Sequence, residues 1–119
     1  MCILNLTQHP LTSEQVNAGC VDVPVAQEGL LKDLLTFDKK PSKTQVWARA
    51  KDIVDIALSQ GVSKAMIGGA PYLMPYLHQL LLEAGIEPLY AFSVRESQEQ
   101  PQPDGSVRKV NVFRFDGFV

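Results

Sequence analysis

The sequence predicts an α/β protein with a Rossmann-like three-layer fold, a mostly parallel sheet and a C-terminal antiparallel hairpin arm. Short apolar runs alternate with segments of helical periodicity through most of the chain, and repeated strand-helix-strand steps imply parallel pairing of the strands. The pattern changes after Glu96, because a polar, proline-containing stretch and the turn signal Asp104-Gly105 precede a last apolar run. Such a turn is typical of a β-hairpin.

Local signals place the elements of the N-terminal half. Thr12 is a candidate helix cap, because Gln15 lies three residues on and can complete a capping box. Asp22 and Pro24 put the second strand at an edge or in a connector. The predicted elements are a strand at Cys2–Leu6, a helix from Thr12 to Gly19, a short strand at Val21–Val25, a helix from about Glu28 to Thr36 and a long helix from Thr44 to Gly61.

The C-terminal half is predicted to continue the same alternation before the arm. Leu73, Leu77, Leu80 and Ala84 recur at helical spacing, which predicts a helix that begins near Pro71 to Pro75 and ends at Gly85. The predicted strands are Lys64–Ile67, the continuous apolar run Pro88–Phe92 and, after the polar segment Gln98–Pro103, the run Ser106–Phe115.

Length and charge restrict the classes of function. The 119 residues fit a single domain, residues 1–119. Eleven basic and thirteen acidic side chains give a net charge of −2, which argues against binding to long nucleic acid. We expect a cytoplasmic protein with no membrane partner, because no stretch suits export or a bilayer. Cys2 and Cys20 have no metal-ligand spacing and are predicted to be reduced, small core residues.

The segment Ile67-Gly68-Gly69-Ala70-Pro71 runs from an apolar strand into the start of a helix. Glycines let the backbone approach a ligand closely, and the free amides at a helix N-terminus suit a phosphate or carboxylate. The alternative is a tight strand-helix connection that binds nothing. A second ambiguous segment is the lysine-containing break at residues 37–43, which is either a solvated loop or a basic lip over an anion pocket.

Polar or glycine-rich segments follow three predicted parallel strands, and ligands bind beyond such carboxyl ends. If the strands are neighbours, the segments Thr7-Gln8-His9, Gly68-Gly69-Ala70 and Ser93 to Glu96 face one cleft. His9 could then move a proton near neutral pH, and Arg95 could neutralise a phosphodiester. The alternatives are that His9 only bonds nearby backbone and that Arg95 and Glu96 form a surface ion pair.

Other chemistries have less support in the sequence. No His, Cys, Asp or Glu cluster has metal-ligand spacing, and the glycine segment lacks both the Walker lysine and the third glycine of a dinucleotide fingerprint. No nucleophile motif is present either. We therefore predict neither a metal nor a cofactor. His78, the second histidine, lies in a predicted helix, where it is expected to be exposed or paired.

Three segments resemble a small group of CRISPR-associated proteins, the stand-alone ring nucleases whose Rossmann-like fold is related to the CARF sensor domain. The segments are Leu4 to Gln15, the glycine loop with Ala70-Pro71-Tyr72-Leu73-Met74, and Arg95-Glu96 with Asp104 to Val110 and Val112-Phe113-Arg114. The resemblance implies a metal-independent phosphodiesterase that degrades a cyclic oligoadenylate second messenger in antiviral defence, as a homodimer. The ribose 2′-hydroxyl would attack its adjacent phosphate.

The resemblance also implies roles for individual residues. His9 and Arg95 would be catalytic, with His9 and Thr7 near the scissile phosphate or ribose. Gly68, Gly69 and Ala70 would hold a phosphate that Arg95 neutralises, and Gln8, Ser93 and Glu96 would complete the ligand site. Tyr72 could stack on an adenine. Relatives carry an acidic and aromatic pair within the glycine loop and a histidine near the end of the last strand, where this chain has Gly69-Ala70-Pro71 and Phe113-Arg114-Phe115. The alternative is a non-catalytic sensor or sponge for a nucleotide.

Overall fold

The computed structural model describes residues 2–119 and contains a four-stranded parallel sheet, four helices and a long hairpin. The elements of the body are β1 (Ile3–Asn5), α1 (Ser13–Asn17), β2 (Cys20–Asp22), α2 (Val25–Leu35), α3 (Lys43–Ser59), β3 (Lys64–Met66), α4 (Met74–Glu83) and β4 (Glu87–Leu89). The hairpin consists of β5 (Ala91–Pro101) and β6 (Val107–Phe118). The predicted α/β class with a C-terminal antiparallel arm is confirmed.

The parallel sheet has the strand order β2-β1-β3-β4. In register, Asn5 of β1 lies between Asp22 of β2 and Met66 of β3. The two strands that precede the predicted ligand loops, β1 and β3, are therefore direct neighbours. This is the arrangement on which the prediction of a shared cleft depended.

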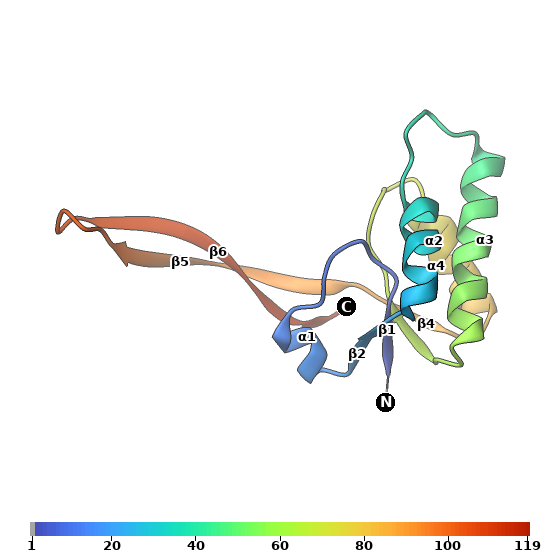
Figure 1. The fold of residues 1–119 in the computed structure, drawn as a ribbon, viewed down its shortest axis with the longest axis horizontal. Coiled ribbons are helices and arrows are strands. Elements are labelled where there is room, and N and C mark those ends of the chain that lie inside the picture. Colours follow the sequence, from blue (N-terminus) through green and yellow to red (C-terminus); the bar gives the residue numbers. More distant parts are fainter. Residues whose placement is uncertain (1) are drawn as a thin grey trace.

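Helices cover the two faces of the sheet unequally (Figure 1). Leu4 and Leu6 of the first strand segment, with Ala65 and Ile67, belong to the main core under α2, α3 and α4. The opposite face holds a small cluster of Ile3, Cys20 and Met66, and Leu11 and Phe118 pack against it. The outer layer on that side thus consists of α1 and the base of the arm.

Capping explains where two helices begin. The Thr12 side chain accepts a hydrogen bond from the Gln15 amide, and the Gln15 side chain accepts one from the Thr12 amide, so the predicted capping box is confirmed. Ser42 and Gln45 form a second capping box at the start of α3. The sequence interpretation did not single out this second box.

Two predicted strands have different bounds in the structure. The predicted strand at Val21–Val25 is confirmed as the edge strand β2, but its bounds are shifted, because β2 spans Cys20–Asp22 and Val25 opens α2 behind Pro24. The fixed φ of proline suits the residue before a helix. The prediction of Pro88–Phe92 as one continuous strand is wrong, because β4 ends at Leu89 and β5 starts at Ala91 in a different sheet.

The hairpin projects from the body as a free arm (Figure 1). The polar stretch at 98–103, predicted as a connection, contributes Gln98 to Pro101 to β5, so the arm is longer than predicted. The radius of gyration is 17.2 Å, whereas a compact domain of this length has about 13.5 Å. The difference reflects the arm.

Two further predictions concern the burial of the two cysteines and the lack of a segment that could span a membrane. Both thiols are free, and Cys20 is buried as predicted, whereas Cys2 is exposed and the prediction that it lies in the core is wrong. Burial, together with the carboxylate of Asp22, raises the pKa of the Cys20 thiol. Within residues 2–119, no helix combines the length and the apolar character that crossing a membrane requires.

Candidate functional site at the carboxyl edge of the sheet

The chain leaves β1 and β3, which are neighbours, toward opposite faces of the sheet. The segment after β1 leads to α1, and the segment after β3 leads to α4, among the helices on the other face (Figure 1). Ligands in open α/β sheets bind where neighbouring connections diverge in this way. The two predicted ligand loops meet there, because a Cβ placed on Gly68 would lie 3.6 Å from Cγ2 of Thr7.

Asn5 fixes the loop that follows β1. Its side chain is buried, with 3% of its surface exposed, and its Oδ1 accepts hydrogen bonds from the Thr7 amide at 3.0 Å and the Thr7 hydroxyl at 2.7 Å. Its Nδ2 donates to the His9 carbonyl and to Oδ1 of Asp22, each at 3.0 Å. The loop therefore presents His9 from a backbone that a buried amide holds in place.

Asn5 was not among the sequence-predicted site residues. It stands inside the apolar run Cys2–Leu6, and a polar residue within a buried strand requires partners. That mismatch was the available signal. The Thr7 hydroxyl, which was predicted to contact ligand, donates its hydrogen bond to Asn5 and accepts one from the His9 amide, so its part in the loop is structural.

A first hollow of about 380 Å³ lies between the Thr7–Pro10 loop and α2. It contains Gln8 and His9, as predicted, but not the glycine loop. The lining residues are Asn5, Thr7, Gln8, His9, Pro10, Asp22, Val23, Glu28, Leu31 and Lys32. Its lining carries two carboxylates, Asp22 and Glu28, against one lysine, Lys32, so the formal charges of these side chains do not favour the capture of an anion.

A second hollow of about 540 Å³ lies farther along the same edge, between the loop after α2 and the first turn of α4. Phe37, Tyr72 and Tyr76 provide aromatic surface, and the remaining lining residues are Asp38, Lys39, Lys40, Pro41, Lys43 and Val46. Three lysines and one aspartate give it a formal charge of +2 in a chain whose net charge is −2. This composition suits a planar anion.

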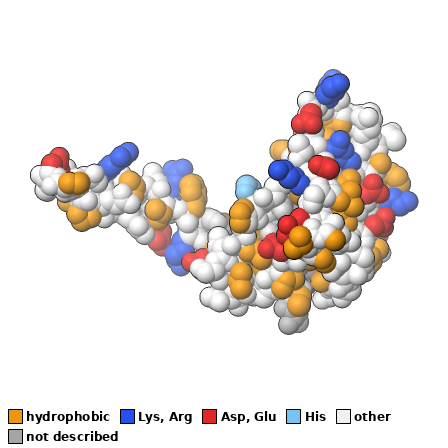
Figure 2. Space-filling model, in the orientation of Figure 1, with side chains coloured by type: hydrophobic (Ala, Val, Ile, Leu, Met, Phe, Trp, Pro, Cys, Tyr) orange, Lys and Arg blue, Asp and Glu red, His pale blue; other side chains and the backbone are white. Residues whose placement is uncertain are grey.

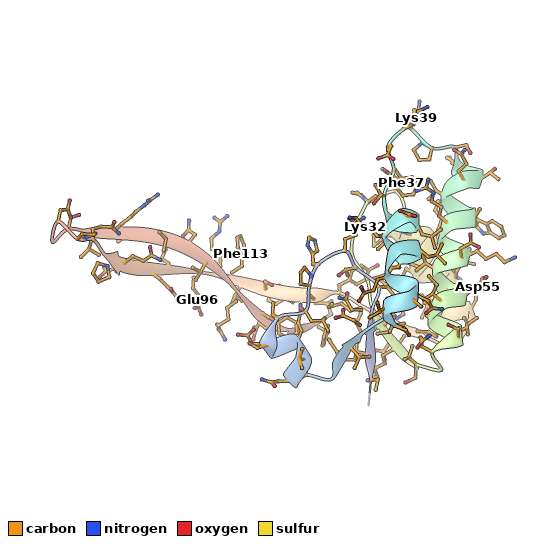
Figure 3. The ribbon with its side chains drawn as sticks, viewed as in Figure 1. Lys32, Phe37, Lys39, Asp55, Glu96 and Phe113 are labelled. Atoms are coloured by element: carbon orange, nitrogen blue, oxygen red, sulfur yellow. The ribbon has the colours of Figure 1, made fainter. Side chains whose placement is uncertain are left out.

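One hydrogen bond links the first hollow to the segment that leads into the second, because Nε2 of Gln8 donates to Oγ1 of Thr36 at 3.1 Å. Within the second hollow, the rings of Phe37 and Tyr72 meet edge to face with centroids 5.1 Å apart. Arg49 on α3 holds Thr36 and Phe37 in place. Its guanidinium donates a hydrogen bond to the Thr36 carbonyl, and its Cζ lies 4.3 Å from the Phe37 ring centroid. Lys32, Phe37 and Lys39 follow one another along α2 and the next loop (Figure 3).

The glycine loop offers donors, but the helix behind it offers few. The amides of Leu73 and Met74 donate to the Ala70 carbonyl at 2.9 and 3.3 Å, and Pro71 and Pro75 have no amide hydrogen. Of the amides at the predicted helix N-terminus, those of Leu73 and Met74 are therefore already bonded and are not free to bind an anion. Within residues 2–119, the amides of Gly68, Gly69 and Ala70 make no backbone hydrogen bond. They are the candidate donors.

The structure separates the third predicted group from the edge. Ser93, Arg95 and Glu96 lie within β5 and pair with β6, not in a loop after β4. The Arg95 guanidinium lies 5.6 Å from the Phe113 ring centroid, and Glu96 forms its ion pair with Arg114 at 2.8 Å instead of with Arg95. The expectation that these residues line the same cleft as His9 and Gly68 is therefore wrong.

The two histidines differ in their surroundings. The His9 ring is exposed beside the first hollow, and its backbone carries the hydrogen bonds to Asn5 and Thr7. His78 is a satisfied partner, one of the two predicted outcomes, because its Nδ1 lies 3.0 Å from the Tyr90 hydroxyl. Burial raises the pKa of Tyr90. Within residues 2–119, no three His, Cys, Asp or Glu side chains are grouped to hold a metal ion.

Comparison with known proteins gives one match. A family model described as the uncharacterized protein MJ1673 family matches residues 1–119, the whole of the chain. No curated protein and no solved structure matches.

Proposed function

The chain belongs to the uncharacterized protein MJ1673 family, and from the geometry of its sheet edge we propose that it binds and cleaves a cyclic oligoadenylate. The observation that carries the proposal is the meeting of two loops at the point where the chain leaves neighbouring strands toward opposite faces. One loop presents His9, and the other presents the amides of Gly68, Gly69 and Ala70. A basic, aromatic hollow lies beside them.

The proposed reaction uses a nucleophile that the ligand itself carries. The ribose 2′-hydroxyl attacks the adjacent phosphorus, the bond to the 5′-oxygen breaks, and the products end in a 2′,3′-cyclic phosphate and a 5′-hydroxyl. His9 moves the proton, and the glycine amides stabilise the charge that develops on the phosphoryl oxygens. Because alignment and charge stabilisation supply the barrier reduction, we propose that the reaction is independent of metal.

The second hollow provides a subsite for a base and its phosphate. The Tyr72 side chain is about half exposed, and it lines this hollow together with Tyr76 and the three lysines. An adenine can stack on an exposed aromatic ring, and Lys39, Lys40 and Lys43 can neutralise the next phosphate. Lys32 lines the same hollow as His9, and we propose that it neutralises a phosphate there, the role that was predicted for Arg95.

We propose further that the protein acts in the cytoplasm as a homodimer. A cyclic ligand with two-fold symmetry presents two equivalent phosphodiesters, and a two-fold dimer presents two equivalent sets of loops. Each subunit would then bind one half of the ring.

The test is incubation of the purified protein with cyclic tetra-adenylate in EDTA, with products resolved by chromatography and mass spectrometry. We expect linear products with 2′,3′-cyclic phosphate ends. His9→Ala should lower the rate constant of cleavage more than it weakens binding, because the imidazole acts in the transition state. Lys39→Ala combined with Lys40→Ala should instead weaken binding.

The control for the lysine pair is Lys51→Ala, since Lys51 lies on α3 over the Trp47 ring and away from both hollows. Equal turnover of wild type and His9→Ala would remove His9 from the mechanism. An intact ring that also fails to bind would contradict the whole proposal.

One observation favours a second function, a sensor or sponge that binds the ring without cleaving it. Arg95, the predicted neutralising group, lies on the arm against Phe113, so the first hollow has Lys32 as its one permanent cation among the described lining residues. Saturable binding of an intact ring, with no product after long incubation, would identify this function.

A further inference from the structure

The arm exposes a surface that nothing in the described chain covers. An isolated two-stranded hairpin is at best marginally stable in water, yet β5 and β6 pair from Ala91 and Phe118 out to Pro101 and Val107, a reach of about 35 Å. Phe113 is 69% exposed and Val107 58% exposed. Figure 2 shows apolar side chains spaced along the arm among charges of both signs.

The two faces of the arm differ in whether their charged side chains form ion pairs and in how far their apolar side chains are exposed. On one face Glu96 pairs with Arg114 beside half-buried valines. Phe113 points to the opposite side from Glu96 (Figure 3). We call that side the Arg95 face; from the cross-strand register its residues are Ser93, Arg95, Ser97, Glu99, Pro101, Val107, Lys109, Asn111, Phe113 and Phe115.

The order of residues on the Arg95 face is self-complementary. Ser97 and Asn111 form its middle row, joined by a hydrogen bond of 3.2 Å. Arg95 lies one row toward the body and Glu99 one row toward the tip. A two-fold axis through the middle row places Arg95 of each copy opposite Glu99 of the other, and Phe115 opposite the apolar pair Pro101 and Val107.

From this pattern we infer that the Arg95 face of the arm binds the same face of a second copy of this chain, in antiparallel orientation. The mixed charges disfavour a lipid surface or a nucleic acid, each of which would select one sign. The contact would bury Phe113 and support a ribbon that lacks a core of its own. It does not depend on the ligand of the sheet edge, although it supplies an interface for the proposed homodimer.

The test is the mass in solution of charge-reversed variants, measured by sedimentation or light scattering over a concentration series. Wild type should be a dimer. Arg95→Glu sets two pairs of carboxylates against each other, and Glu99→Arg sets two pairs of cations, so each variant alone should weaken the dimer roughly tenfold or more. An equimolar mixture of the two variants should recover it, because in the mixed dimer positions 95 and 99 of the two copies again set opposite charges against each other.

Arg114→Glu is the matched control, since it reverses an arginine on the other face of the same ribbon and should leave the dissociation constant unchanged. A wild type that stays monomeric throughout, an unweakened dimer in both variants, a mixture that fails to recover, or an equal loss in the control would each overturn the inference. Because none of these measurements involves cleavage, failure here is distinct from failure of the proposed reaction.

Discussion

Asn5 shows how one buried polar residue can determine a loop. Its amide and carbonyl groups make four hydrogen bonds to Thr7, His9 and Asp22, so both the loop after β1 and the end of β2 depend on it. Leaving such partners unpaired in the interior costs more than the bonds themselves contribute. Asn5 therefore links the stability of the fold to the position of His9.

We expect Asn5→Ala to lower the free energy of unfolding by about 2–4 kcal/mol, because buried donors and acceptors lose their partners. Urea unfolding of the variant measures this loss. Asn17→Ala is the control, because Asn17 is exposed at the end of α1, away from the Arg95 face of the arm; it should change the value by no more than about 0.5 kcal/mol. Equal losses in the two variants would contradict the role assigned to Asn5.

The two cysteines should differ sharply in reactivity. Cys2 is exposed, whereas Cys20 has 3% of its surface exposed and a raised pKa, so the thiolate that reacts is disfavoured at Cys20. At mildly alkaline pH a thiol reagent should label one cysteine quickly and the second after unfolding. The Cys2→Ser protein should show no fast phase, and a fast phase in that variant would refute the burial of Cys20.

The raised pKa of Cys20 also predicts how stability depends on pH. The folded state favours the neutral thiol, so its contribution is complete below the pKa of the unfolded chain and is lost as pH rises through the folded pKa. The free energy of unfolding should therefore fall in the alkaline range, and Cys20→Ala should reduce that slope. Tyr90, whose pKa burial also raises, should account for part of what remains.

Among the elements, the glycine loop combines two different requirements in adjacent residues. Gly69 has φ of +148°, a conformation that side chains disfavour, whereas Gly68 has no such angle. A Cβ on Gly68 would reach Thr7 at ordinary van der Waals distance. One glycine is thus needed for the backbone, and the other keeps the meeting point of the two loops open.

We expect Gly69→Ala to lower the free energy of unfolding by about 1–2 kcal/mol through backbone strain, while Gly68→Ala stays within about 1 kcal/mol of wild type. Thermal or urea unfolding distinguishes them. Ligand binding should show the reverse order of sensitivity, because the new methyl group at position 68 occupies the approach to the loop amides. A Gly68→Ala protein that binds cyclic tetra-adenylate as wild type does would remove the glycine loop from the site.

Periodicity and local signals predicted several elements and missed others for physical reasons. The Thr12 capping box and the turn at Asp104-Gly105 depend on a few neighbouring residues, so sequence shows them directly. The division of the run Pro88–Phe92 between two sheets depends on which strand each half pairs with, and an apolar run carries no such information. The position of Arg95 was mispredicted for that reason.

The candidate site was predictable to the same degree. The loops at Thr7 and Gly68 were expected to converge because both follow strands, and they do. Asn5 and Lys32 were missed, since their roles depend on contacts with Asp22 and with the Thr7–Pro10 loop. The sequence could not decide whether the basic segment at 37–43 is a solvated loop or a basic lip over an anion pocket. In the structure this segment lines a hollow with Tyr72 and Tyr76, a placement that depends on how α2, α3 and α4 pack together.

The whole molecule consists of a body with a core and an arm without one. The main core is confined to the sheet and the helices, and the arm contributes Phe118, at its base, to the small cluster on the other face. No residue from Phe92 to Phe115 is buried. The body should therefore fold without most of the arm, whereas pairing between copies should need it.

Replacing Ser97–Asn111 by a two-residue Asn-Gly turn tests this division, because Glu96 and Val112 are cross-strand partners that such a turn can join. We expect the shortened protein to unfold cooperatively, with a midpoint temperature within a few degrees of that of wild type. Changes confined to the surface of a domain of this size shift the midpoint by roughly that amount. X-ray scattering should give a radius of gyration below the 17.2 Å of the full chain. Loss of cooperative unfolding would mean that the arm supports the body, and a shortened protein that still forms dimers would place the interface on the body instead of on the arm.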